Sequence, residues 1–144
     1  MNDIKDILSK YKKIAMIGVS NDLTKASTIV MKYMQKYGYK IYPVNPKAKG
    51  QKILGERVYE KITDIKDSID IVDVFRPSKE VPAIAKDTIK IGAKVLWLQL
   101  GIKSEEAKKL MEKNNIRYIE NKCTKMEYQS YFLKVRQAFP ALQE

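Results

Sequence analysis

The chain has 144 residues, of which 44% are hydrophobic and 9% aromatic, enough for the core of one domain but not for a second catalytic domain. It has no histidine and one cysteine, Cys123, which excludes His-dependent nucleophile pairs, an internal disulfide and a thiolate zinc site built from this chain. Its 28 Lys and Arg against 17 Asp and Glu give a formal net charge of +11, which favours anionic ligands such as nucleic acid, acidic lipid or a phosphate-rich cofactor. An ordinary solubilising surface explains most of these lysines equally well.

Membrane and export signals are absent from the sequence. The longest apolar stretches, such as residues 94–100, fall far short of the ~20 residues that a membrane-spanning helix needs. No apolar signal segment follows Met1, and a single thiol suits a reducing compartment. We therefore expect a cytoplasmic protein that does not enter membranes.

Helical and strand patterns alternate along the chain. Apolar residues at i, i+3, i+4 and i+7 predict a leading helix within residues 1–12. Apolar runs that end at small polar residues, glycine or proline predict strands at 13–20, 39–44, 69–75, 94–100 and 116–119. Amphipathic stretches predict helices at 24–37, 77–91, 104–114, with Ser104 as N-cap, and 125–140. Residues 53–65 are expected to form a crossover with a short helical turn.

This alternation predicts an α/β fold with a doubly wound, mainly parallel sheet and helices on both faces. A single domain is expected over residues 1–144, with a leading helix at 1–12, a core at 13–124 and a closing helix at 125–140. In such sheets, ligands bind beyond the carboxyl ends of the strands, where the winding reverses. The residues just after each strand are therefore the candidates for a binding site.

Two loops in the first half of the chain favour phosphate. Gly18, Val19 and Ser20 follow the first strand and lead into a helix, an arrangement whose backbone amides can bind a pyrophosphate, although the full G-x-G-x-x-G pattern is missing. Asn45, Pro46 and Lys47 follow the second strand, where an NAD-binding fold would place a carboxylate. Lysine suits an extra phosphate, such as the 3′-phosphate of coenzyme A or the 2′-phosphate of NADP. A tight turn and a solvated loop are the alternatives.

The later strand ends carry further candidates. Arg76 is expected at the mouth of the crevice, with Pro77 at the first position of the following helix. Gly101 lies in a bend where a ligand could approach the backbone. Cys123 falls on the same edge of the sheet, although a lone cysteine is more often a small core residue. We identify no catalytic and no metal-ligating constellation.

Six segments together resemble a known family. They are Gly18-Val19-Ser20, Tyr42-Pro43-Val44-Asn45-Pro46, Leu54-Gly55-Glu56-Arg57-Val58-Tyr59, Asp70-Ile71-Val72-Asp73-Val74-Phe75-Arg76-Pro77, Trp97-Leu98-Gln99-Leu100-Gly101-Ile102 and Cys123-Thr124-Lys125-Met126-Glu127-Tyr128. This pattern resembles the small stand-alone CoA-binding domain proteins, which are related to the CoA-binding domain of the succinyl-CoA synthetase alpha subunit. The resemblance spans residues 11–131.

The resemblance implies a Rossmann-like fold with coenzyme A across the carboxyl edge of the sheet. It implies three groups of contacts: with the phosphates, Gly18, Val19, Ser20 and Lys25; with the nucleotide end, Asn45, Pro46 and Lys47; and along the rest of the cofactor, Phe75, Arg76, Pro77, Gln99, Gly101, Ile102 and Cys123. Val19 stands where the family usually has alanine, and Ser78 where it often has proline or glutamate. The synthetase's phosphorylated histidine has no counterpart here, so ligase chemistry is not implied.

We therefore expect a protein that binds coenzyme A or an acyl-CoA without catalysis of its own. An NADP-linked oxidoreductase on the same fold is the alternative, and a basic nucleic-acid-binding protein is a third, although no nucleic-acid recognition motif is present. A homodimer or another protein partner is left open. A narrower hypothesis is that Cys123 forms a mixed disulfide with coenzyme A under oxidation.

Overall fold

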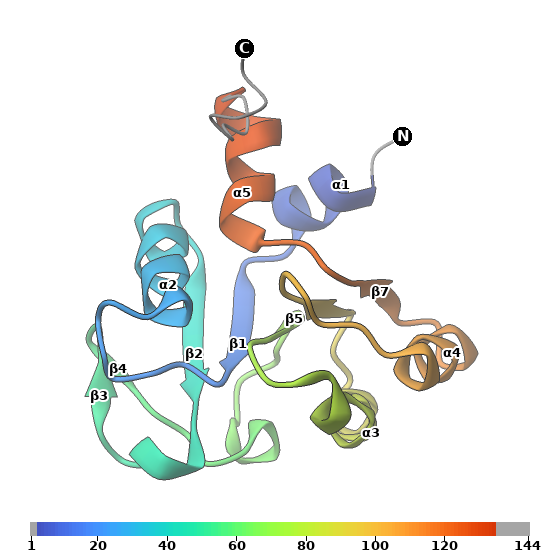
Figure 1. Ribbon diagram of the computed structural model, residues 1–144, viewed down its shortest axis with the longest axis horizontal. Coiled ribbons are helices and arrows are strands. Elements are labelled where there is room, and N and C mark those ends of the chain that lie inside the picture. Colours follow the sequence, from blue (N-terminus) through green and yellow to red (C-terminus); the bar gives the residue numbers. More distant parts are fainter. Residues whose placement is uncertain (1–2, 135–144) are drawn as a thin grey trace.

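The computed structural model describes residues 3–134, which form a five-stranded parallel sheet between two layers of helices (Figure 1). Its strands lie in the order β2-β1-β5-β6-β7, and all four neighbouring pairs are parallel. Their bounds are β1 Lys13–Ile17, β2 Lys40–Val44, β5 Ile71–Val74, β6 Val95–Leu98 and β7 Arg117–Ile119. The winding reverses between β1 and β5, which confirms the predicted doubly wound, Rossmann-like class.

Three helices pack on one face of the sheet and two on the other (Figure 1). On the first face lie α1 Asp3–Lys10, α2 Ala26–Lys36 and α5 Thr124–Tyr128, which continues as the π-helical segment η4 Gln129–Leu133. On the second face lie α3 Val81–Ile91 and α4 Glu105–Lys113. Short 3-10 turns connect the elements: η1 Pro46–Ala48, η2 Ile62–Asp64 and η3 Ser78–Glu80.

The central strands are apolar on both faces because both faces are covered. Every residue of β5 and β6 is buried, and alternate side chains enter the two cores. Trp97 packs with the α1, α2 and α5 layer, whereas Leu96 and Leu98 pack with α3 and α4. Because burial of a large apolar side chain contributes about 1.5–3 kcal/mol, these two cores hold the strand ends in place.

One local prediction was wrong, and another was confirmed but incomplete, since the expected crossover does contain a short helical turn at Ile62–Asp64. The predicted helix from Pro77 begins only at Val81, because Pro77 has an extended ψ of 148° and leads into η3. Pro82 instead occupies the first turn of α3, a position that proline tolerates because the first N–H groups of a helix have no partner within it. The crossover contains an unforeseen antiparallel hairpin of two-residue strands, β3 Lys52–Ile53 and β4 Glu56–Arg57, too short for an alternating pattern.

The other described helix ends follow the predictions closely. Ser104 caps α4, since its Oγ accepts a hydrogen bond from the Ala107 N–H at 3.1 Å. The predicted closing helix is confirmed as far as Leu133, and its remainder, like residues 1 and 2 of the leading helix, lies outside the described residues. No helix within residues 3–134 is long and apolar enough to cross a membrane.

Candidate functional site

Gly18 lies at the switch point, where the loop after β1 meets the chain after β5. Its φ is +94°, and a Cβ at this position would lie 2.6 Å from the Phe75 carbonyl oxygen and 2.9 Å from the Arg76 Cδ. The Gly18 N–H donates a hydrogen bond of 2.8 Å to the Val44 carbonyl at the end of β2. Glycine is therefore required for three strand ends to come together here.

The loop between β1 and α2 is held by its own side chains. The Ser20 N–H donates to Ser27 Oγ at 3.1 Å, and Thr28 Oγ1 donates to the Ser20 carbonyl at 2.7 Å. Lys25 is exposed directly before α2, and the first turn of α2 contains no acidic residue. The start of this helix therefore offers a positive end that favours an anion.

Asn45 joins this loop to the end of β2. Its Nδ2 donates to the Val19 carbonyl at 2.9 Å, and its Oδ1 accepts from the Lys47 N–H at 2.9 Å. The Val19 side chain is fully buried in the core. Asn45 therefore fixes the shape of the two loops, and Lys47 keeps its side chain exposed for a ligand.

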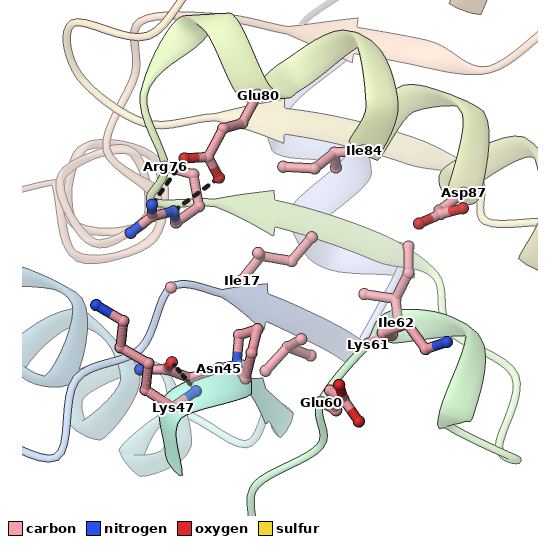
Figure 2. A pocket seen from close by; sticks show the side chains of 13 residues that line it. Ile17, Asn45, Lys47, Glu60, Lys61, Ile62, Arg76, Glu80, Ile84 and Asp87 are labelled. Carbon is pink, nitrogen blue, oxygen red and sulfur yellow. Dashed lines mark hydrogen bonds and ion pairs between the residues drawn. The ribbon is translucent and has the colours of Figure 1, made fainter. Parts of the chain in front are cut away.

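A first cavity of about 340 Å³ opens between these loops and α3 (Figure 2). Arg76 and Glu80 lie across it from Asn45 and Lys47 (Figure 2). Its lining has an apolar part (Ile17, Gly18, Val44, Pro46, Ile62 and Ile84) and a polar part (Asn45, Lys47, Glu60, Lys61, Arg76, Glu80 and Asp87). The charged part of this edge holds three cations, Lys47, Lys61 and Arg76, and three carboxylates, and one of the cations is paired with Glu80. The apolar part is wide enough for a planar base, with Lys47 and Lys61 as the cations left to meet a phosphate.

Arg76 forms a two-point ion pair with Glu80 at the rim. Its Nε donates to Oε1 at 2.9 Å and its Nη2 to Oε2 at 2.7 Å. This pair raises the pKa of Arg76 and lowers the pKa of Glu80. Because both side chains are substantially exposed, the pair contributes little stability, but it holds the guanidinium at the cavity.

A second cavity of about 300 Å³ lies on the other side of Arg76, which lines both. Its lining comes from α2 and from the segments after β5, β6 and β7: Ala26, Val30, Phe75, Arg76, Pro77, Gln99, Leu100, Ile102 and Cys123. This cavity is mostly apolar. Burial raises the pKa of the Cys123 thiol, which therefore stays protonated at neutral pH.

A buried polar cluster adjoins the second cavity. Gln99 Nε2 donates to Asp73 Oδ1 at 2.6 Å and to Thr124 Oγ1 at 3.1 Å, and Thr124 Oγ1 donates to Asp73 Oδ2 at 3.3 Å. Asp73 and Thr124 are fully buried, and Gln99 is 4% exposed. Burial raises the pKa of Asp73 to about 7, against the opposing effect of its hydrogen bonds.

The structure brings most of the residues implied by the resemblance to the two cavities. Gly18, Asn45, Pro46, Lys47 and Arg76 line the first, and Phe75, Arg76, Pro77, Gln99, Ile102 and Cys123 line the second. Four line neither cavity: Val19, Ser20, Lys25 and Gly101. Among residues 3–134, no group of three His, Cys, Asp or Glu residues could hold a metal ion.

Sequence reasoning missed the residues that the crossover and α3 bring to the first cavity, and it missed the buried Asp73. Lys61, Ile84 and Asp87 reach the first cavity from a crossover and from a helix, away from any strand end. The parallel bridge between Val44 and Tyr59 and the ion pair between Lys40 and Glu56 bring the crossover beside β2, and no local pattern predicts them. Asp73 did carry a signal, since it is the one carboxylate in the otherwise apolar strand 71–74.

Comparisons with known proteins agree with this geometry. A family model described as CoA binding domain matches residues 12–129. The uncharacterized protein YneT of Bacillus subtilis is 36% identical over 126 residues, which cover 88% of this chain and 92% of that protein. A solved structure of a hypothetical protein from Pyrococcus horikoshii OT3 has a TM-score of 0.84 and 38% identity, with 88% of each chain covered.

A larger enzyme is also related to the chain. The ADP-forming acetate–CoA ligase of Methanocaldococcus jannaschii is 30% identical over 124 residues, which are 81% of this chain but only 17% of the ligase. The match to the family model covers most of the chain, and YneT is related over nearly its whole length. The chain therefore belongs to the CoA-binding domain family.

Proposed function

We propose that this protein binds coenzyme A along the carboxyl edge of the sheet, with the nucleotide end in the first cavity and the pantetheine arm in the second. The observation that carries the proposal is the pair of cavities that meet at Arg76, the first with an apolar slot and charged side chains and the second mostly apolar, in a member of the CoA-binding domain family. Along the edge, the charged first cavity is followed by the apolar second cavity, just as the phosphorylated nucleotide of coenzyme A is followed by the pantetheine arm. The ligand is either coenzyme A or an acyl-CoA.

The first cavity suits the phosphorylated nucleotide. Its apolar part can accept the adenine base, and Lys47 and Lys61 provide ammonium groups for the 3′-phosphate. Arg76 lies between the cavities, where the pyrophosphate would pass, and the start of α2 adds a favourable field for the same charge. Charged hydrogen bonds of this kind contribute about 1.5–3 kcal/mol each.

The second cavity suits the pantetheine arm. Phe75, Pro77 and Ile102 offer apolar contact to an aliphatic chain, and Gln99 offers a polar group among them. Cys123 lies in the same wall, so the end of the arm would approach this thiol. A mostly apolar cavity with one or two placed polar groups is the usual form of a small-molecule site.

The proposed role is binding without turnover. The chain has no histidine, and it spans 17% of the related acetate–CoA ligase, so most of that enzyme has no counterpart in it. The acid–base and nucleophilic chemistry of a coenzyme A ligase would have to come from residues outside this domain.

Isothermal titration at near-physiological salt tests the proposal directly. We expect saturable binding of coenzyme A and no binding of NADP at the same concentrations. Absence of coenzyme A binding up to millimolar concentrations would overturn the proposal. Binding of NADP alone would favour the oxidoreductase, and binding of unrelated nucleic acid that disappears at moderate salt would indicate only non-specific attraction to the +11 charge.

A further inference from the structure

The buried carboxyl of Asp73 calls for an explanation. Its side chain has no exposed surface, and the hydrogen bonds that hold it come from Gln99, Thr124 and the Val74 backbone, none of which carries a charge. Burial of a carboxylate without a cationic partner is costly, and an apolar residue of similar volume is often at least as stable at such a position. The stability of the fold therefore does not explain why a carboxyl group occupies this position.

The hydrogen bonds of this cluster fix the orientation of the Gln99 amide. Above about pH 7, where Asp73 is ionised, its carboxylate can only accept hydrogen bonds, so the Gln99 atom that lies 2.6 Å from Asp73 Oδ1 is then the donating Nε2. The second hydrogen of Nε2 points to Thr124 Oγ1, whose own hydrogen is directed to Asp73 Oδ2. With Asp73 ionised, this closed ring leaves the amide no alternative orientation.

The carbonyl oxygen of the same amide remains as an acceptor. Among residues 3–134, no hydrogen bond ends on Gln99 Oε1, although the residue is 4% exposed and lines the second cavity. Gln99 follows Trp97 at even spacing, so its side chain lies on the sheet face covered by α2 and α5, as do Phe75 and Cys123. A carbonyl oxygen at the wall of a cavity can accept from water in the free protein and from a ligand donor when the cavity is filled.

We propose that Asp73 is a positioning residue that holds the Gln99 amide so that Oε1 accepts a hydrogen bond from a pantetheine amide N–H of bound coenzyme A. This inference rests on the proposed function and adds to it a requirement for a hydrogen-bond donor in the ligand. The backbone of Gln99 supports the role, because its N–H donates to the Val74 carbonyl and its carbonyl accepts from the Ile102 N–H. Asp73 itself does not touch the ligand.

The test compares two ligands and three single variants by isothermal titration. Coenzyme A carries the pantetheine arm, whereas adenosine 3′,5′-bisphosphate carries only the phosphorylated nucleoside. Asp73→Leu removes the acceptor that orients the amide, and Gln99→Met removes the amide itself. Asp73→Asn is the matched control, since its Oδ1 can still accept from Gln99 Nε2.

We expect Asp73→Leu and Gln99→Met each to weaken coenzyme A binding about threefold to tenfold, as for one neutral hydrogen bond, with bisphosphate binding unchanged. The double variant should be no weaker than either single variant, and Asp73→Asn should bind like the wild type. Acetyl-CoA, which has no S–H group, should show the same losses, because the proposed donor is an amide.

Other results would overturn the inference. Equal losses for both ligands would indicate general damage to the site, and a loss confined to ligands with a free thiol would exclude the amide as the donor. If Asp73→Leu does not fold, Gln99→Met decides, and unchanged coenzyme A affinity in that variant refutes the inference. Failure of the wild type to bind coenzyme A would instead refute the proposed function.

Discussion

The two cavities at the carboxyl edge of the sheet differ in the kind of polar group that lies beside them. In the first, the charged atoms of Lys47, Lys61 and Arg76 lie at the surface, and their side chains add little to the packing of the fold. In the second, the polar atoms of Asp73, Gln99 and Thr124 lie inside the core and bond to one another. The rim charges can therefore be changed without loss of the fold, whereas the interior group is coupled to stability.

The exposed and the buried polar groups therefore contribute differently to ligand binding and to the stability of the fold. An exposed ammonium group pays no desolvation cost in the free protein, so nearly all of its contribution appears when an anion binds. A buried carboxyl group is already desolvated, and its effect on a ligand passes through the atoms it orients. Gly18 lies at the junction of the loops that shape both cavities, so we expect its substitution to affect both ligand binding and the stability of the fold.

Substitution of Gly18 should have the largest effect. Gly18→Ala places a Cβ 2.6 Å from the Phe75 carbonyl oxygen at a φ of +94°, so both strain and overlap oppose it. We expect a loss of about 2–5 kcal/mol in the free energy of unfolding, measured by urea denaturation, together with weaker coenzyme A binding.

Gly101→Ala is the matched control for this variant. Its φ is +82°, but a Cβ there would meet no atom within 4 Å, so only the strain remains. A loss of about 1–2 kcal/mol is expected. Equal losses in the two variants would mean that the close approach of the strand ends at Gly18 is not required.

The buried carboxyl should make stability depend on pH. The folded protein holds a proton on Asp73 up to about pH 7, whereas an unfolded chain releases it near the ordinary value of 3.8. Between these values the folded state binds more protons, so the contribution of Asp73 to the free energy of unfolding falls as pH rises, by up to about 1.4 kcal/mol per pH unit.

Asp73→Asn removes this titration. Urea denaturation at pH 5 and pH 8 should therefore show the wild type losing stability relative to the variant at the higher pH. Parallel pH profiles for the two proteins would indicate that Asp73 is ionised throughout and that its burial is better compensated than its contacts suggest.

A change at the rim should weaken binding and leave the fold intact. We expect Lys47→Ala to weaken coenzyme A binding roughly tenfold or more, since one charged hydrogen bond to phosphate is lost, with an unchanged melting temperature. Dephospho-CoA, which lacks the 3′-phosphate, should bind wild type and variant equally. Lys109→Ala, on the exposed side of α4, is the control for net charge, and an equal loss there would reduce the role of Lys47 to general attraction.

The parts of the fold and of the site that the sequence predicts are those with a local signal. The apolar runs of β5 and β6 and the breakers after each strand predict the sheet and its carboxyl edge, because those signals are local. Arg76 and Lys47 were identifiable for the same reason, since each lies in the loop that follows a strand.

The remaining site residues depend on contacts that no local pattern encodes. Lys61 and Asp87 reach the first cavity only through the path of the crossover and the rotation of α3. The pairing of Asp73 with Thr124 joins residues 51 positions apart, and the hairpin of β3 and β4 is too short to leave an alternation. The phosphate contacts implied for Val19 and Ser20 stay predictions. The Val19 side chain is buried in the core and Ser20 Oγ accepts from the Asp22 N–H, so the side chains of these two residues serve the loop itself.

The smallest expected effect concerns Cys123, in the wall of the second cavity. Because burial raises the pKa of this thiol, alkylation by iodoacetamide at pH 8 should be slower than for a free cysteine, and bound coenzyme A should slow it further by covering the cavity. Adenosine 3′,5′-bisphosphate, which reaches only the first cavity, should give no protection. Incubation with oxidised coenzyme A should yield the mixed disulfide only slowly, detected by intact mass. Protection by the bisphosphate as strong as that by coenzyme A would mean that the two cavities do not divide the ligand between them.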